Sequence, residues 1–156
     1  MADMGRAWRT WRGLTGREHW LALEAWLALP LIALALRVAG FKRVHGTLAR
    51  WNVDTLARWN VRTCERANVE ALSALRVANV VDRVARRHPC RPTCLTRSLA
   101  LWWLLGRRRI AAELRVGVRK EGGSLQAHAW VESCGQVLGE AGDVGDRFAA
   151  LGRVEG

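Results

Sequence analysis

The sequence predicts an α+β fold, in which an N-terminal layer of helices packs on one further helix and a small antiparallel sheet. Two observations support this class. Apolar residues recur at helical spacing through most of residues 18–105, whereas residues 112–138 alternate between apolar and polar side chains, as strands do. The chain has 156 residues, half of them hydrophobic, so one domain with a core of its own is expected.

The first predicted helix covers residues 18–39. Pro30 should kink or break this helix, and Gly40 should end it. Its segment 20–36 is apolar, but Glu24 interrupts it and the longest uncharged run has twelve residues, fewer than the roughly 20 that a bilayer requires. We therefore expect a buried helix, with peripheral contact to a membrane as the alternative.

A second helix is predicted over residues 63–88, where apolar residues recur mainly every three or four positions. Before it, residues 47–53 (TLARWNV) are repeated as residues 55–61, which we interpret as a local duplication within a helical or loop segment. The segment 88–92 (HPCRP) then breaks the chain sharply and separates this helical part from the C-terminal part of the chain.

A third helix and three strands complete the expected elements. Thr93 is a good N-cap, so a helix is expected over residues 94–105, closed by Gly106. Turns are expected at residues 121–124 and 134–135, because both contain glycine between alternating segments. The predicted strands cover residues 112–118, 125–132 and 136–138.

The net charge is +11, and nearly all of the positive charge is arginine. Such a surface favours polyanions, membrane surfaces or acidic peptides as partners, without choosing among them. A non-enzymatic basic protein that binds nucleic acid or a membrane is therefore one alternative. The cysteines, Cys64, Cys90, Cys94 and Cys134, are expected to be free thiols in a cytoplasmic protein, because the chain is neither small nor rich in cysteine.

Cys94 and His128 are the candidate nucleophile and base. Cys94 falls in the first turn of the predicted third helix, where unpaired backbone N–H groups and the helix dipole favour an anion such as a thiolate. His128 lies on a predicted strand beside two small alanines, on the same face as Trp130 and Glu132. An imidazole there can take the thiol proton and later protonate a leaving amine.

A carboxylate should orient this imidazole through its second ring nitrogen. Glu140 and Asp143, at the end of the last predicted strand and just after it, are the candidates. Glu132 is expected to be a solvated strand residue instead. The backbone N–H of Cys94 or the side chain of Gln126 could stabilise an oxyanion.

A zinc site is the rival chemistry. His88, Cys90 and Cys94 form a His-x-Cys-x3-Cys run, which Cys134 and His128 could complete. Structural zinc sites usually contain closer pairs of ligands such as Cys-x2-Cys. We therefore expect neither a metal nor a cofactor.

Four segments together resemble one known family. Residues 94–101 (CLTRSLAL), 112–118 (AELRVGV), 127–132 (AHAWVE) and 137–140 (VLGE) are similar to the lasso-peptide leader peptidases, transglutaminase-like proteins that process microcin-type precursors. The resemblance covers roughly residues 89–151. It implies a transglutaminase-like or papain-like cysteine peptidase fold with a Cys–His–Asp triad.

Residue by residue, the resemblance implies Cys94 as nucleophile, His128 as base and Glu140 as third member. The family commonly has Asp at that last place, so Asp143 stays open. The implied activity is removal of the leader from a ribosomally made precursor peptide. A separate leader-binding protein would present the precursor, and an ATP-dependent cyclase would then close the ring; no nucleic acid is implied. A transglutaminase-type amide transferase could use the same Cys and His.

The expected domain organisation combines these predictions. Residues 1–17 should form a basic N-terminal arm, residues 18–88 a helical region and residues 89–156 the transglutaminase-like catalytic core. The latter two parts should share one compact domain.

Overall fold

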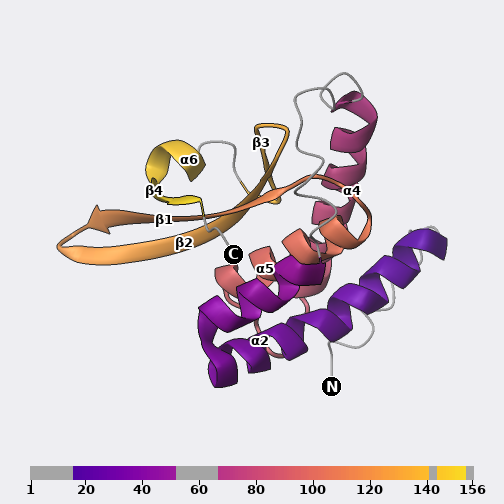
Figure 1. Ribbon diagram of the computed structural model, residues 1–156, viewed down its shortest axis with the longest axis horizontal. Helices are drawn as coiled ribbons and strands as arrows, with labels where there is room; N and C mark the ends of the chain where they lie inside the picture. The colour runs from indigo at the N-terminus through magenta and orange to yellow at the C-terminus, as the bar shows by residue number, and fades with distance from the viewer. Residues whose placement is uncertain (1–15, 52–66, 141–143, 154–156) are drawn as a thin grey trace.

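The structure is a computed structural model that describes residues 16–51, 67–140 and 144–153. Figure 1 shows a group of helices on one side of a long β-hairpin, with a short helix and a short strand on the other side. In chain order the elements are α2 (Gly16–Trp51), α4 (Ala67–Ala85), α5 (Cys94–Arg107), β1 (Glu113–Glu121), β2 (Ser124–Ser133), β3 (Gln136–Leu138), α6 (Val144–Arg147) and β4 (Ala149–Arg153). The predicted α+β fold is confirmed.

α2 runs through Pro30 without the break that the sequence predicts. The residue inside α2 with non-helical dihedrals is Gly40 (φ 74°, ψ 166°). Glycine adopts such a positive φ without the penalty that a side chain brings. The predicted end of the helix at Gly40 is therefore a sharp turn between two arms, residues 16–39 (the first arm) and residues 41–51 (the second arm).

The first arm is buried on one face and exposed on the other. Ala22, Ala25 and Leu29 are buried, whereas Trp20 and Leu31 are each 65% exposed. The small alanines let the helix lie close to α4 and α5, the helices with which α2 packs. The prediction of a buried helix is thus correct for the inner face of the first arm and wrong for its outer face. An apolar sequence does not specify how many faces of a helix pack against other elements.

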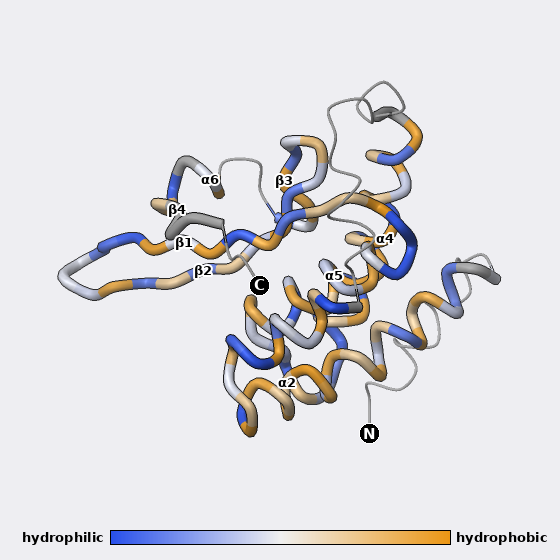
Figure 2. The backbone as a smooth tube through the Cα atoms, in the orientation of Figure 1, coloured by the Kyte–Doolittle hydropathy of each residue, from blue (hydrophilic) through white to orange (hydrophobic). Residues whose placement is uncertain are grey.

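One core joins the helices to the sheet. Its fully buried members include Leu29 of α2, Val81 of α4, Leu99 and Leu104 of α5, and Val131 of β2. α5 therefore covers one face of the sheet, α4 reaches β3, and α2 packs on α4 and α5. Figure 2 shows hydrophobic stretches along α2, α5 and the hairpin.

The four antiparallel strands lie in the order β3-β2-β1-β4. β1 and β2 form the long hairpin, whose turn contains Gly122 and Gly123, both at positive φ. The three predicted strands and their turns are confirmed. The sequence does not predict α6 or β4, and β4 adds a fourth strand by pairing with β1.

α6 and the residue that follows it, Phe148, bring a second, smaller apolar cluster onto the other face of the sheet. Trp130 of β2 packs there with Val144 and Phe148. Gly117 of β1 has no room for a side chain, because a Cβ would lie 2.8 Å from the Trp130 ring and 2.9 Å from Phe148 Cβ. Gly117 is also the strand partner of His128. The close packing therefore surrounds the position of the candidate base.

Several expectations fall outside the described residues. These are most of the basic arm, the second copy of the repeat, the start of the predicted second helix, Cys64 and Asp143. The first copy of the repeat continues the second arm as a helix up to Trp51. The boundaries drawn at residues 17 and 88 stay predictions.

Candidate active site

Cys94 is the first residue of α5, as predicted. The N-cap is Thr93, which has extended dihedrals and whose hydroxyl accepts a hydrogen bond from the Thr96 N–H at 3.3 Å. Arg97 and Ser98 follow three and four residues later, so they lie on the same side of the helix as Cys94. The contacts of these two side chains therefore show what this side of α5 faces.

Ser98 fixes the start of α5 to the edge of β2. Its buried hydroxyl donates a hydrogen bond to the carbonyl of Ala129 at 2.8 Å. The last pair between β2 and β3 is Val131 with Leu138, so Ala129 lies just beyond the point where β3 stops. Because β3 is short, the edge of β2 at Ala129 is not paired with β3, and Ser98 of α5 bonds to it there.

His128 and Glu140 meet at this same edge. The Nε2 atom of His128 lies 3.5 Å from Glu140 Oε1. Gly139, at φ 71°, directs the chain away from β3 just before Glu140. Glu140 also forms an ion pair with Arg97 of α5. One carboxylate therefore contacts both the imidazole from the sheet and the helix that Cys94 begins.

The other side of the imidazole faces aromatic rings. The His128 ring lies 5.2 Å from the Phe148 ring and 6.4 Å from the Trp130 ring, measured between centroids. Trp130 Nε1 donates to Glu132 Oε1 at 2.8 Å, and Arg115 bonds the second oxygen of that carboxylate. Glu132, expected to be solvated, thus holds the Trp130 side chain beside the site.

The surroundings of His128 disfavour its charged form. Burial lowers the pKa of His128, and the positive charges of Arg97, Arg147 and Arg119 lower this pKa further. The imidazole is therefore neutral at neutral pH and able to accept a proton. The same positive charges favour any anion that forms next to the ring.

The structure joins two of the predicted site residues directly. His128 and Glu140 are in contact, whereas no hydrogen bond joins the half-buried Cys94 thiol to the His128 ring within the described residues. Gln126, considered as an oxyanion donor, instead accepts hydrogen bonds from Arg119 on the hairpin. Arg97 is a site residue that the sequence did not predict, although its place one turn after Cys94 could have suggested it.

A second cysteine–histidine pair lies in the turn before α5. Cys90 Sγ is 2.8 Å from His88 Nδ1, and the Cys90 N–H donates to the same nitrogen at 3.2 Å. His88 Nε2 is 3.1 Å from the carbonyl of Trp26 on α2. The sequence predicts His88 and Cys90 only as rival zinc ligands. Among the described residues no three His, Cys, Asp or Glu side chains gather as metal ligands would.

Comparison with known proteins identifies the fold family. A sequence profile described as the transglutaminase-like superfamily matches residues 34–153. The chain belongs to this superfamily. Membership in this superfamily indicates a cysteine hydrolase.

A curated relative is more specific. The microcin J25-processing protein McjB of Escherichia coli is 38% identical over 61 residues, which are 39% of this chain and 28% of that protein. The chain therefore matches less than a third of the relative's length. No solved structure matches the chain. The transglutaminase-like protein is thus distantly similar to a protein that processes a microcin.

Proposed function

We propose that this transglutaminase-like protein is a cysteine peptidase that removes the leader from a lasso-peptide precursor. Cys94 is the nucleophile, His128 the base and Glu140 the residue that orients the imidazole. The observation that carries the proposal is the double contact of Glu140, which touches His128 on the sheet and Arg97 on the helix that begins at Cys94.

The course of α5 along β2 supports the pairing of Cys94 with His128. Ser98 bonds the carbonyl of Ala129, and Trp102, one turn later, donates to the carbonyl of Ala112 at 3.1 Å. Ala112 lies at the far end of the hairpin, where Ser133 of β2 bonds the neighbouring carbonyl of Ala111. α5 and β2 therefore run in the same direction. Cys94 lies one turn before Ser98, about 5.4 Å along the helix. We therefore expect Cys94 to be level with the part of β2 just before Ala129, which is where His128 lies.

The contacts of the imidazole fit the roles of such a triad. With Nε2 directed to Glu140, Nδ1 is the nitrogen left to take the proton of the Cys94 thiol. Since burial and nearby arginines lower the pKa of His128, the ring is unprotonated and can act as a base. Glu140 would then stabilise the imidazolium once the proton has moved.

Cleavage takes place in two steps. The thiolate attacks the carbonyl carbon at the leader junction, and the N–H groups of the first turn of α5 are placed to stabilise the resulting oxyanion. The C–N bond breaks as the imidazolium gives its proton to the leaving amine of the core peptide. Water then hydrolyses the thioester, releases the leader as a carboxylate and restores the thiol.

The relative's role suggests the context of this activity. McjB processes microcin J25, and we propose a precursor peptide of the same class as substrate here. A separate leader-binding protein would present it, and an ATP-dependent cyclase would take the freed amine. We place these steps in the cytoplasm, where free thiols persist.

The experiment combines the purified protein with a linear precursor and its leader-binding protein and follows the products by mass spectrometry. We expect two fragments whose masses sum to the precursor plus one water. Cys94→Ala and His128→Ala should abolish cleavage while thermal unfolding stays cooperative. Joining of a fragment to an amine without addition of water would identify an amide transferase, and cleavage by Cys94→Ala would refute the proposal.

A further inference from the structure

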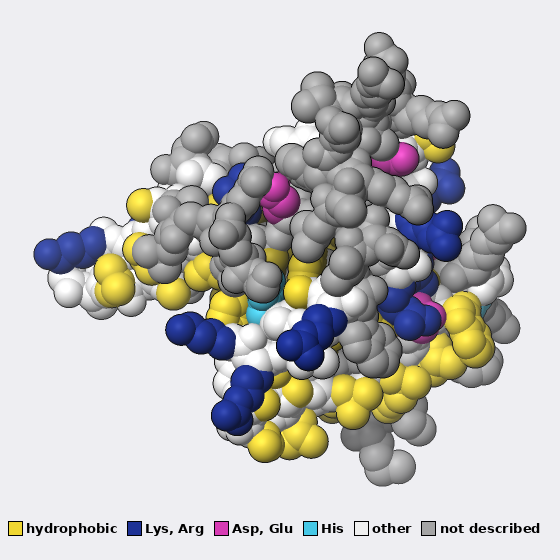
Figure 3. Space-filling view, in the orientation of Figure 1, with side chains coloured by type: hydrophobic (Ala, Val, Ile, Leu, Met, Phe, Trp, Pro, Cys, Tyr) yellow, Lys and Arg dark blue, Asp and Glu magenta, His cyan; other side chains and the backbone are white. Residues whose placement is uncertain are grey.

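The outer face of the first arm of α2 is a continuous apolar surface. Its side chains recur every three or four residues and are exposed; they are Trp20, Leu23, Leu27, Leu31, Leu34 and Val38 (the α2 apolar face). Between residues 20 and 34, every exposed side chain that the structure describes is apolar. Figure 3 shows hydrophobic side chains in a row along this helix. Apolar surfaces of this extent usually mark a docking site.

The geometry of α2 favours a helix that lies along a surface over one that crosses a membrane. By length and composition residues 18–50 could span a bilayer, and only 33% of the most apolar window is buried, so much of this helix is free to contact lipid. The inner side of the helix, with Ala25 and Leu29, belongs to the core. Gly40 also turns the chain back after the first arm. Insertion across a bilayer would require the core to open.

Positive charge accompanies the α2 apolar face. Exposed Arg37 lies next to Val38 at the C-terminal end of this face, and exposed Lys42 and Arg43 follow the turn at Gly40. The protein as a whole carries a net charge of +11. Glu24, the acidic residue in the middle of the first arm, forms ion pairs with Arg107 and Arg108. An apolar face containing tryptophan beside exposed cations is the pattern of helices that lie in the interface of anionic membranes.

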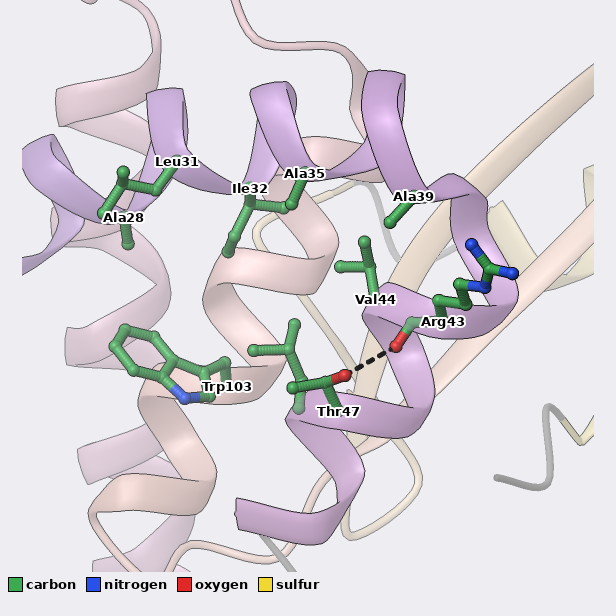
Figure 4. Close-up of a pocket in the computed structure, with 10 residues that line it drawn as sticks. Ala28, Leu31, Ile32, Ala35, Ala39, Arg43, Val44, Thr47 and Trp103 are labelled. Carbon is green, nitrogen blue, oxygen red and sulfur yellow. Dashed lines mark hydrogen bonds between the residues drawn. The ribbon is translucent and has the colours of Figure 1, made fainter.

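An apolar pocket opens beside this face. It has a volume of about 350 Å³ and lies between the two arms of α2 and α5. Leu31 belongs both to the pocket and to the α2 apolar face, and Arg43 lines the pocket as well. Figure 4 shows Ile32 and Ala35 above this space, Thr47 and Trp103 below it, and Val44 and Arg43 at one side. A flexible acyl chain with its anionic headgroup matches a pocket that is apolar inside and cationic at its end.

We propose that the α2 apolar face docks the protein on an anionic lipid bilayer, with the first arm lying parallel to the membrane plane. The apolar side chains enter the boundary between headgroups and acyl chains, and Arg37, Lys42 and Arg43 contact the lipid phosphates. This surface is independent of the proposed peptidase chemistry. Its test measures lipid binding and does not require cleavage.

The experiment floats the full chain with vesicles of phosphatidylglycerol and phosphatidylcholine, and with vesicles of phosphatidylcholine alone. The variant L31E/L34E changes side chains that are 65% and 59% exposed; its matched control, V69E/L72E on α4, changes side chains that are 73% and 59% exposed. We expect L31E/L34E to bind anionic vesicles at least about tenfold more weakly. The control should bind like the unchanged protein.

A second pair of variants tests the charges. K42A/R43A should weaken binding to anionic vesicles and reduce its salt dependence, whereas R86A/R87A, exposed on the turn after α4, should change it less. Equal binding to both kinds of vesicle would overturn the role of the cations.

Two results would overturn docking on lipid altogether. One is undiminished vesicle binding by folded L31E/L34E. The other is a dimer in sedimentation equilibrium without lipid that L31E/L34E dissociates, because the α2 apolar face would then bind a second copy. If circular dichroism shows L31E/L34E to be unfolded, Leu34→Gln takes its place, with Leu72→Gln as control.

Discussion

The two cysteine–histidine pairs of this protein differ in what surrounds them. In the turn before α5, Cys90 Sγ contacts His88 Nδ1 directly, and the other nitrogen of His88 faces the Trp26 carbonyl. At the sheet edge, His128 instead contacts Glu140, and Arg97, Arg147 and Arg119 lie near the His128 ring. Cys90 and His88 are in direct contact, whereas no hydrogen bond joins Cys94 to His128 among the described residues, and it is His128 that has the carboxylate and the charges.

The difference shows why contact alone does not identify a nucleophile. A carbonyl fixes the tautomer of His88, but it has no full charge with which to stabilise an imidazolium. Cys90 is exposed in a turn, whereas Cys94 begins a capped helix whose N–H groups favour an anion. We therefore expect the His88 pair to hold the turn against α2 and the His128 site to carry the chemistry.

The sharpest way to break this comparison is to exchange the two thiols for hydroxyls. Cys94→Ser should lower kcat/KM for precursor cleavage by at least about 10⁴-fold, because the nucleophile is lost. Cys90→Ser, its matched control, should change kcat/KM less than about twofold. The reverse result would make Cys90 the nucleophile and His88 its base.

The carboxylate is the next test. Glu140→Gln keeps the shape of the side chain but removes the charge that faces His128 Nε2. We expect kcat to fall by about 10²- to 10⁴-fold with little change in KM. The control is Glu132→Gln. It alters a carboxylate that lies on the same strand as His128 and accepts a hydrogen bond from Trp130, and it should affect kcat far less. If Asp143→Asn instead causes the large loss, Asp143 is the third member.

Close packing beneath His128 gives a test of the second cluster. Gly117→Ala forces a Cβ against Trp130 and Phe148, so the free energy of unfolding should fall by about 1–3 kcal/mol and kcat should fall with it. Gly46→Ala in the second arm, where nothing lies within 4 Å of the new Cβ, should instead raise the unfolding free energy by about 0.5–1 kcal/mol. Urea unfolding of both variants checks the signs.

The link between α5 and β2 should be weaker but measurable. Ser98→Ala leaves the buried Ala129 carbonyl without its donor and should cost about 1–2 kcal/mol of unfolding free energy. Ser73→Ala, which removes an exposed hydroxyl bonded to the preceding turn of α4, should be neutral or slightly stabilising. If Ser98→Ala keeps both stability and kcat, this hydrogen bond does not position the start of α5.

The sequence predicted those parts of the site that local rules specify. A capping threonine, a helix beginning at Cys94 and an alternating strand through His128 all depend on neighbours in the chain, and all are confirmed. The meeting of Glu140 with Arg97 depends on where β3 stops and on a glycine at positive φ. Helical periodicity puts Arg97 on the same side of α5 as Cys94, but it carries no information on the contact with Glu140.

Elements that lack a clear period escape prediction for the same reason. α6 has four residues, and β4 is recognisable only through its pairing with β1. Conversely, Pro30 was expected to interrupt α2, yet the arm continues because its packing on α4 and α5 outweighs the local preference. The outer face of the first arm makes a related point: where a helix is apolar on more than one face, the sequence does not reveal which face stays exposed.

The smallest expected effect concerns the pH dependence of the site. The pKa of His128 is lowered by burial and by Arg97, Arg147 and Arg119, so protonation should inactivate the base only below the ordinary range of histidine. Arg119→Gln removes one of these charges; the pKa of His128 should rise, and the acid limb of kcat/KM should move to higher pH. Arg86→Gln, paired with Asp82 on α4, should leave the limb in place. A shift to lower pH in Arg119→Gln would mean that a group other than His128 sets the acid limb, because loss of a positive charge can only raise the pKa of His128.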